Sequence, residues 1–171
     1  MKWNLFLSLA MLTVTLGAGC GESEEHDHDE HDEMSAEGEA CTHAQDSPTT
    51  VVAGSGIAGL DADVSQSHTL YEVTLNETEA GSGDYSGYLS FEAPEHADYL
   101  IFTSTQAELS VLDSADVALE TTVSGVDGCV ELAQAHRVAL DAERYVIEIG
   151  PVSTSTLSLI IESEAHDHDH D

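Results

Sequence analysis

The sequence predicts an all-β fold, an antiparallel β-sandwich, over residues 41–161. Short segments of this body alternate apolar and polar residues with a period of two, as strands buried on one face do. Clusters of turn-forming residues, such as Gly81-Ser82-Gly83-Asp84, recur about every ten positions. The body has no long amphipathic helix pattern, and a length of 171 residues favours a single domain.

Each expected strand rests on its own pattern. In the segment 69–75, Tyr71 and Val73 share one face and Glu72 lies on the other. The segment 98–105 contains a continuous apolar run, which suits a central strand. The expected strands are 49–53, 69–75, 85–92, 98–105, 108–113, 117–123, 129–132, 136–140, 143–149 and 156–161.

Three stretches of the body resemble known β modules. Leu140-Asp141-Ala142-Glu143-Arg144-Tyr145 resembles the Leu-x-x-x-x-Tyr corner of β-sandwich domains. Together with Leu100-Ile101-Phe102 and Leu109-Ser110-Val111-Leu112-Asp113, it is similar to pre-peptidase C-terminal and related jelly-roll modules of secreted bacterial proteins, with Glu143 in place of their glycine. The resemblance implies a jelly-roll-like sandwich with an accessory or binding role rather than a reaction.

The first 20 residues have the layout of an export signal. Lys2 precedes an uncharged run over 5–16, which is shorter than the about 20 residues of a membrane-spanning helix. Leu16-Gly17-Ala18-Gly19-Cys20 resembles the lipobox of bacterial lipoproteins, with Gly17 where the family usually has leucine. The resemblance implies a signal peptide over 1–19 and lipidation of Cys20. It also implies anchorage to a membrane of the cell envelope, at the outer membrane or the periplasmic face. Cleavage by an ordinary signal peptidase is the alternative.

Acidic residues outnumber basic ones by 34 to 3, and the formal net charge is −31. This charge excludes nucleic acid as a partner, because such binding requires a basic surface. Fifteen of the 34 acidic residues lie in the two short ranges 22–39 and 162–171, which contain almost no residues that could build a core. We therefore expect residues 20–40 to be a disordered acidic tether and residues 162–171 a disordered tail.

Histidines alternate with carboxylates in both of these segments. Imidazole nitrogen and carboxylate oxygen together bind borderline divalent metals such as zinc, nickel or copper. We expect modest affinity, because a flexible segment must be ordered when it binds. The six histidines concerned are His26, His28, His31, His166, His168 and His170.

The body holds a second group of candidate residues. His43, His68 and His136 are candidate ligands of a further metal site, and independent histidines at the surface or at strand ends are the interpretation that the pattern favours. His136 has the parity of the apolar residues in its strand, so its side chain is expected to point inward. Cys41 and Cys129 are expected to pair as a disulfide in an exported chain, and metal binding by Cys41 beside His43 is the alternative.

The function predicted from these features is non-enzymatic. We expect a lipid-anchored protein of the cell envelope that binds divalent transition metal through its His/Asp-rich tails, with a possible His site on the sandwich. A structural or interaction module with solvating acidic tails is the alternative, and no protein partner is indicated. The sequence contains no G-x-S-x-G or H-E-x-x-H motif, and no nucleophile–base pair can be named.

Overall fold

The computed structural model describes residues 35–164 of the chain. Residues 1–34 and 165–171, which include the expected signal peptide and most of both expected tails, lie outside this range. Within it, no helix is both long and apolar enough to cross a membrane.

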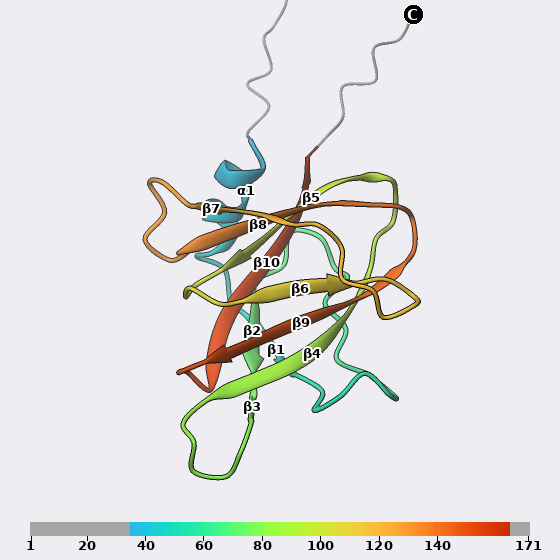
Figure 1. Cartoon of the computed structure of the whole chain (residues 1–171). Coiled ribbons are helices and arrows are strands. Elements are labelled where there is room, and N and C mark those ends of the chain that lie inside the picture. Colours follow the sequence, from blue (N-terminus) through green and yellow to red (C-terminus); the bar gives the residue numbers. More distant parts are fainter. Residues whose placement is uncertain (1–34, 165–171) are drawn as a thin grey trace, which may run out of the picture. The chain divides into compact units, whose positions relative to one another are not determined.

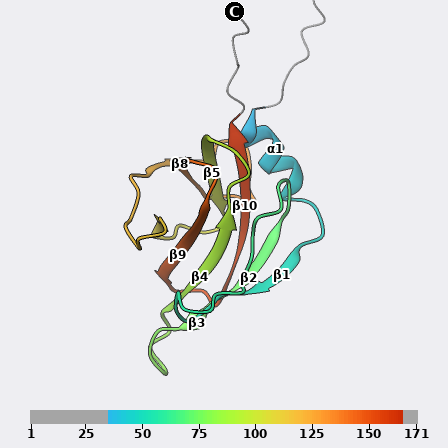
Figure 2. The same cartoon turned by 90° about the vertical axis from the view of Figure 1, so that its right-hand side faces the viewer.

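The described chain folds into two β-sheets packed face to face, with one short helix (Figures 1 and 2). The six-stranded sheet has the order β1-β2-β10-β5-β8-β7, and the four-stranded sheet has the order β3-β4-β9-β6. All-β sandwich architecture is thus confirmed. The elements are α1 (Ala36–His43), β1 (Thr49–Val52), β2 (Tyr71–Thr74), β3 (Asn76–Glu77), β4 (Tyr85–Glu92), β5 (Ala97–Thr103), β6 (Leu109–Leu112), β7 (Thr122–Gly125), β8 (Gln134–Leu140), β9 (Arg144–Val152) and β10 (Thr156–Glu164).

Neighbouring strands are antiparallel except for β1 and β2, which run parallel. The connection between these two strands explains the exception, because it leaves the first sheet and follows the edge of β4. Gly54 donates its N–H to the carbonyl of Tyr88 at 2.8 Å, and Val64 donates to Ser90 at 2.9 Å. The chain then returns to the six-stranded sheet as β2, which runs in the same direction as β1.

The main core lies between the two sheets, and it is filled by the apolar residues that alternate with polar ones along each strand. Tyr71 and Val73 of β2 are buried while Glu72 is exposed, as expected. Ile147 and Ile149 of β9 are fully buried from the opposite sheet. Alternation of side chains across each strand therefore suffices to assign these inward faces.

The expected tyrosine corner is present at the start of β9. The hydroxyl of Tyr145 accepts the N–H of Asp141 at 3.0 Å and donates to the carbonyl of the same residue at 3.3 Å. The ring of Tyr145 is buried in the main core. These two bonds tie the β8–β9 connection to the strand that follows it.

A second, smaller core covers the outer face of the six-stranded sheet. Leu100 and Phe102 of β5 and Ile160 of β10 form its floor. Helix α1 packs on this floor through Ala40, which is fully buried, and Cys129 contributes from the loop before β8. Figure 2 shows α1 beside the upper end of β10.

Two expected strands differ from the structure. Residues 129–132 form a turn, because Cys129 and Leu132 pack into the second core rather than into a ladder. In the segment 117–123, only the last two residues belong to a strand, the exposed edge strand β7.

The expected domain boundaries also differ at both ends. Residues 36–40, assigned to the tether, begin α1, where Ser35 caps the helix by accepting the N–H of Gly38 at 3.3 Å. Strand β10 continues past residue 161 to Glu164, because its pairing with β5 extends to Asp98. The folded body is therefore longer at each end than the composition indicates.

Removing the hydroxyl of the tyrosine corner in Tyr145→Phe should lower the free energy of unfolding by about 1 kcal/mol, because two hydrogen bonds to Asp141 are lost. Chemical denaturation measures this change. Tyr85→Phe is the matched control, since no described residue hydrogen-bonds the Tyr85 hydroxyl, and its unfolding should be unchanged. Equal stabilities of the two variants would contradict the corner's role.

Candidate metal centre

Three side chains that could bind a metal meet where α1 packs against β10. His43 is the last residue of α1, His68 lies in the loop before β2, and Glu162 lies near the end of β10. One ligand atom from each lies within 4.8 Å of the other two. Residues far apart in the sequence thus form one cluster at the margin of the second core.

Glu162 is the buried base of this cluster. Its side chain is 1% exposed and lies on the same face of β10 as Ile160, opposite Leu100 in register. Neither carboxylate oxygen has an aligned hydrogen bond within the described chain. Burial raises the pKa of Glu162 above its usual range, although His68 and His43 oppose this shift. A carboxylate in this position requires a positive counter-charge or a proton.

His68 brings an imidazole directly to this carboxylate. Its Nδ1 lies 2.9 Å from Oε2 of Glu162 and 3.9 Å from Oε2 of Glu39, although the first contact is not aligned as a hydrogen bond. The backbone of His68 has φ +53°, a left-handed conformation that is uncommon for residues other than glycine. The loop is held in this form partly by Tyr71, whose hydroxyl accepts the N–H of Gln66 at 3.0 Å.

His43 presents the second imidazole from the C-terminal end of α1. Its ring centroid lies 5.2 Å from that of His68. Asp46 contacts Nδ1 of His43 at 2.9 Å, so Nε2 is the nitrogen left to bind a metal. A carboxylate on the far nitrogen is a common partner of metal-bound histidine, because it orients the ring and makes it more basic. The carbonyl end of a helix also favours positive charge.

The donor set matches borderline divalent metals. Two imidazoles and a carboxylate are ligands that zinc, nickel and copper accept, and Oε2 of Glu39 lies near them, 3.9 Å from Nδ1 of His68. Bonds of about 2.0–2.2 Å place tetrahedral ligands roughly 3.3 Å apart. Small movements of the histidine side chains would therefore close the cluster around an ion. His68 is 54% exposed and His43 26%, so solvent reaches the site from one side.

The structure brings together only part of the expected histidine group. His136 is buried inside the sandwich, as its strand parity indicates, and Nε2 lies 2.8 Å from Nε2 of Gln134. Burial lowers the pKa of His136, which favours the neutral ring. Its side chain points to the inner face of the sheet, whereas Glu162 lies on the outer face with His43 and His68 beside it.

The remaining expected sites lie outside the described residues. These are Cys20 and the tail histidines His26, His28, His31, His166, His168 and His170. Glu162 and Glu39 were not singled out from the sequence, because both fall in acidic segments whose composition indicates solvated tails. The β-branched run that precedes Glu162 is the local signal that the strand continues.

The two cysteines of the body lie side by side as free thiols. Cys41 is half-buried on α1, and Cys129 is buried in the second core. Burial, together with a hydrogen bond to Cys129, raises the pKa of Cys41 to about 11. The pair expected to form a disulfide is thus adjacent in the fold, without a bond between the two sulfurs in this structure.

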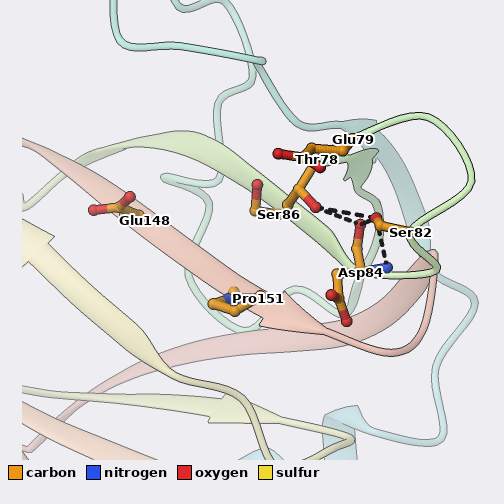
Figure 3. Close-up of a pocket in the computed structure, with 8 residues that line it drawn as sticks. Thr78, Glu79, Ser82, Asp84, Ser86, Glu148 and Pro151 are labelled. Carbon is orange, nitrogen blue, oxygen red and sulfur yellow. Dashed lines mark hydrogen bonds between the residues drawn. The ribbon is translucent and has the colours of Figure 1, made fainter.

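A separate open pocket of about 560 Å³ lies at the end of the four-stranded sheet where a loop connects β3 to β4 (Figure 3). Its polar side chains mainly bond one another: the hydroxyl of Thr78 contacts that of Ser82 at 3.3 Å, and both donate to the carbonyl of Asp84. Glu148 accepts the hydroxyl of Tyr88 at 2.9 Å. These contacts account for the local structure without a ligand. The lining residues are Thr78, Glu79, Ser82, Asp84, Ser86, Glu148, Gly150 and Pro151.

Comparisons with known proteins give no relative from which a role for the site could be taken. No protein-family model matches the chain, and no curated protein matches it.

The pH dependence of stability should report the burial of Glu162. Because its pKa is raised from 4.5, its contribution to the free energy of unfolding is present below that pH and is lost as pH rises through the raised value. Glu162→Gln removes this loss of stability, because the amide does not ionise as pH rises. Without metal, the variant should be more stable than the wild type at mildly alkaline pH by about 1–3 kcal/mol.

Denaturation across a pH series in the presence of a chelator measures this effect. The control is Glu120→Gln at an exposed position, which should leave the pH profile unchanged. Parallel profiles for the wild type and Glu162→Gln would contradict a buried ionisable carboxyl.

Proposed function

We propose that this chain is a lipid-anchored, non-enzymatic protein of the cell envelope that binds a divalent transition metal, zinc, nickel or copper. The observation that most supports the proposal is the carboxylate of Glu162, which is 1% exposed, lacks aligned hydrogen bonds and faces two imidazoles. A divalent ion would satisfy all three groups at once.

The charge balance of the cluster favours a cation. Glu39 and Glu162 supply two negative charges, whereas His43 and His68 are neutral when they act as ligands. A buried carboxylate is costly unless it is paired, and one protonated imidazole neutralises only half of this charge. A divalent ion neutralises the cluster in full, and the net charge of −31 raises the local concentration of cations around the protein.

The histidine-rich tails attach to the chain close to this cluster. His166 is four residues beyond Glu162, and His31 is five residues before Ala36, where α1 begins. An extended chain spans at most about 3.6 Å per residue, so His166 stays within about 15 Å of Glu162. Metal held loosely by the tails would therefore be present at high effective concentration near the folded site. We infer that the tails collect the ion and that the cluster retains it.

Anchorage gives the tether a role in the same proposal. Lipidation of Cys20 would place residues 21–34 between the membrane and the folded body. Ten acidic residues between positions 22 and 39 repel anionic membrane surfaces and attract cations. The binding segments would thereby be held in the aqueous phase of the envelope.

Metal affinity should depend on the cluster. Calorimetric titration of the full chain with Zn²⁺ should show tight binding, and His43→Ala, His68→Ala and Glu162→Gln should each raise the Kd by at least about tenfold, or about 1.4 kcal/mol. Parallel titrations with Ni²⁺ and Cu²⁺ rank the metals. His96→Ala is the matched control, because His96 also pairs with a carboxylate, Asp141 at 2.8 Å, but lies outside the group of possible metal ligands found among residues 35–164. Wild-type affinity in all three cluster variants would overturn the folded site.

Replacing the six tail histidines with serine tests the other part of the proposal. This variant should lose the weak additional sites but keep the tight one, and its loading with metal should slow. Loss of all binding would assign the metal to the tails alone. No binding by the intact chain would favour the alternative hypothesis, an interaction module with solvating tails.

Bound metal should also stabilise the fold. When free Zn²⁺ is present at about 100 times its Kd, the free energy of unfolding should rise by about 2.7 kcal/mol.

A further inference from the structure

Helix α1 links the metal cluster to the two thiols of the body. It supplies Glu39 and His43 to the cluster, and between them it places Cys41 beside Cys129. The remaining cluster residues, His68 and Glu162, belong to the sheet and its adjoining loop. The cluster is therefore assembled from a helix half and a sheet half, and its geometry depends on how firmly α1 is held.

The helix is short and depends on its contacts with the sheet. With eight residues, α1 is below the length at which an isolated helix is stable in water. Ala40 is its one fully buried residue, and Ala36, Cys41 and Ala44 pack only partly against the second core. Small side chains bury little apolar area, so these contacts hold the helix weakly. Any further link between α1 and the sheet would restrict His43 and Glu39 directly.

Cys129 is connected through the chain to the sheet that carries Glu162. It lies 7% exposed in the loop before β8, and β8 pairs with β5, which pairs in turn with β10. A covalent bond from Cys41 to Cys129 would tie α1 to this framework two residues from His43.

We propose that Cys41 and Cys129 form a reversible disulfide that fixes α1 and thereby tightens metal binding by the His43–His68–Glu162 cluster. This inference rests on the proposed metal-binding function and adds its regulation. The oxidant is a second disulfide, either in a thiol oxidase or in a small molecule. Cys41, the more exposed thiol, loses its proton, and the thiolate attacks one of its sulfurs to give a mixed disulfide and a leaving thiolate, which takes up a proton. Cys129 then displaces the second thiol, so two thiols are oxidised and one disulfide is reduced.

Zinc affinity in the two redox states tests the proposal. The full chain with Cys20→Ser is prepared reduced with a phosphine, or oxidised with glutathione disulfide, and mass spectrometry verifies each state. The oxidised chain should bind Zn²⁺ about tenfold more tightly, because the ligands are held in place before the ion arrives. Hydrogen exchange at the α1 amides should slow in the oxidised chain, which reports the same restraint without metal.

The double variant Cys41→Ala/Cys129→Ala should match the reduced chain in affinity and should not respond to oxidant. Equal affinity in both states of the wild type would overturn the redox inference and leave the proposed function intact. Tighter binding by the reduced chain, lost in the double variant, would also overturn it, because the thiols would then be ligands. Absence of zinc binding in both states would overturn the proposed function as well.

Discussion

The outer face of strands β5 and β10 is apolar and must be covered, and the rest of the described structure depends on that constraint. The inner face of the same sheet is covered by the four-stranded sheet. Leu100, Phe102 and Ile160 on the outer face are covered by α1 and the loop before β8. Because this cover is small, the boundary between the second core and solvent falls close to Glu162. The candidate metal centre lies at this boundary.

Burial and charge act together at this position. Glu162 belongs to a strand that must continue its pairing with β5, so its carboxylate is held on the covered face. The carboxylate of Glu162 is buried where α1 packs against β10 and brings His43, and the neighbouring loop brings His68 in a left-handed conformation. An uncommon backbone conformation at His68 and a buried carboxylate that contacts its imidazole at 2.9 Å thus occur in one place. The same helix bears Cys41, so α1 carries one residue of the candidate metal cluster and one of the thiol pair.

Much of the fold could be predicted because its signals are local. Alternation in β2 and β9 assigns Tyr71 and Ile147 to the core, and the spacing of the Tyr145 corner is read from six consecutive residues. The errors occur where tertiary contacts override local pattern. Helix α1 contains Gly38 and has no strong apolar stripe, so its formation depends on contact with the sheet in addition to its caps. Cys129 and Leu132 resemble strand residues because they are apolar, but they cover a sheet instead of joining one.

By itself, the sequence determined the residue types and the strands: the period-two pattern sets which side chains point inward, and histidine and carboxylate composition indicates a divalent metal. Only the tertiary structure decided which of these residues meet. His43 and His68 come together while His136 points into the sandwich, and Glu162 is buried beside them although the acidic composition of residues 162–171 predicts a solvated tail. The physical reason is that strand parity is a property of a few adjacent residues. A metal cluster requires contacts between a helix, a loop and a strand, which only the packing of the sheets brings together.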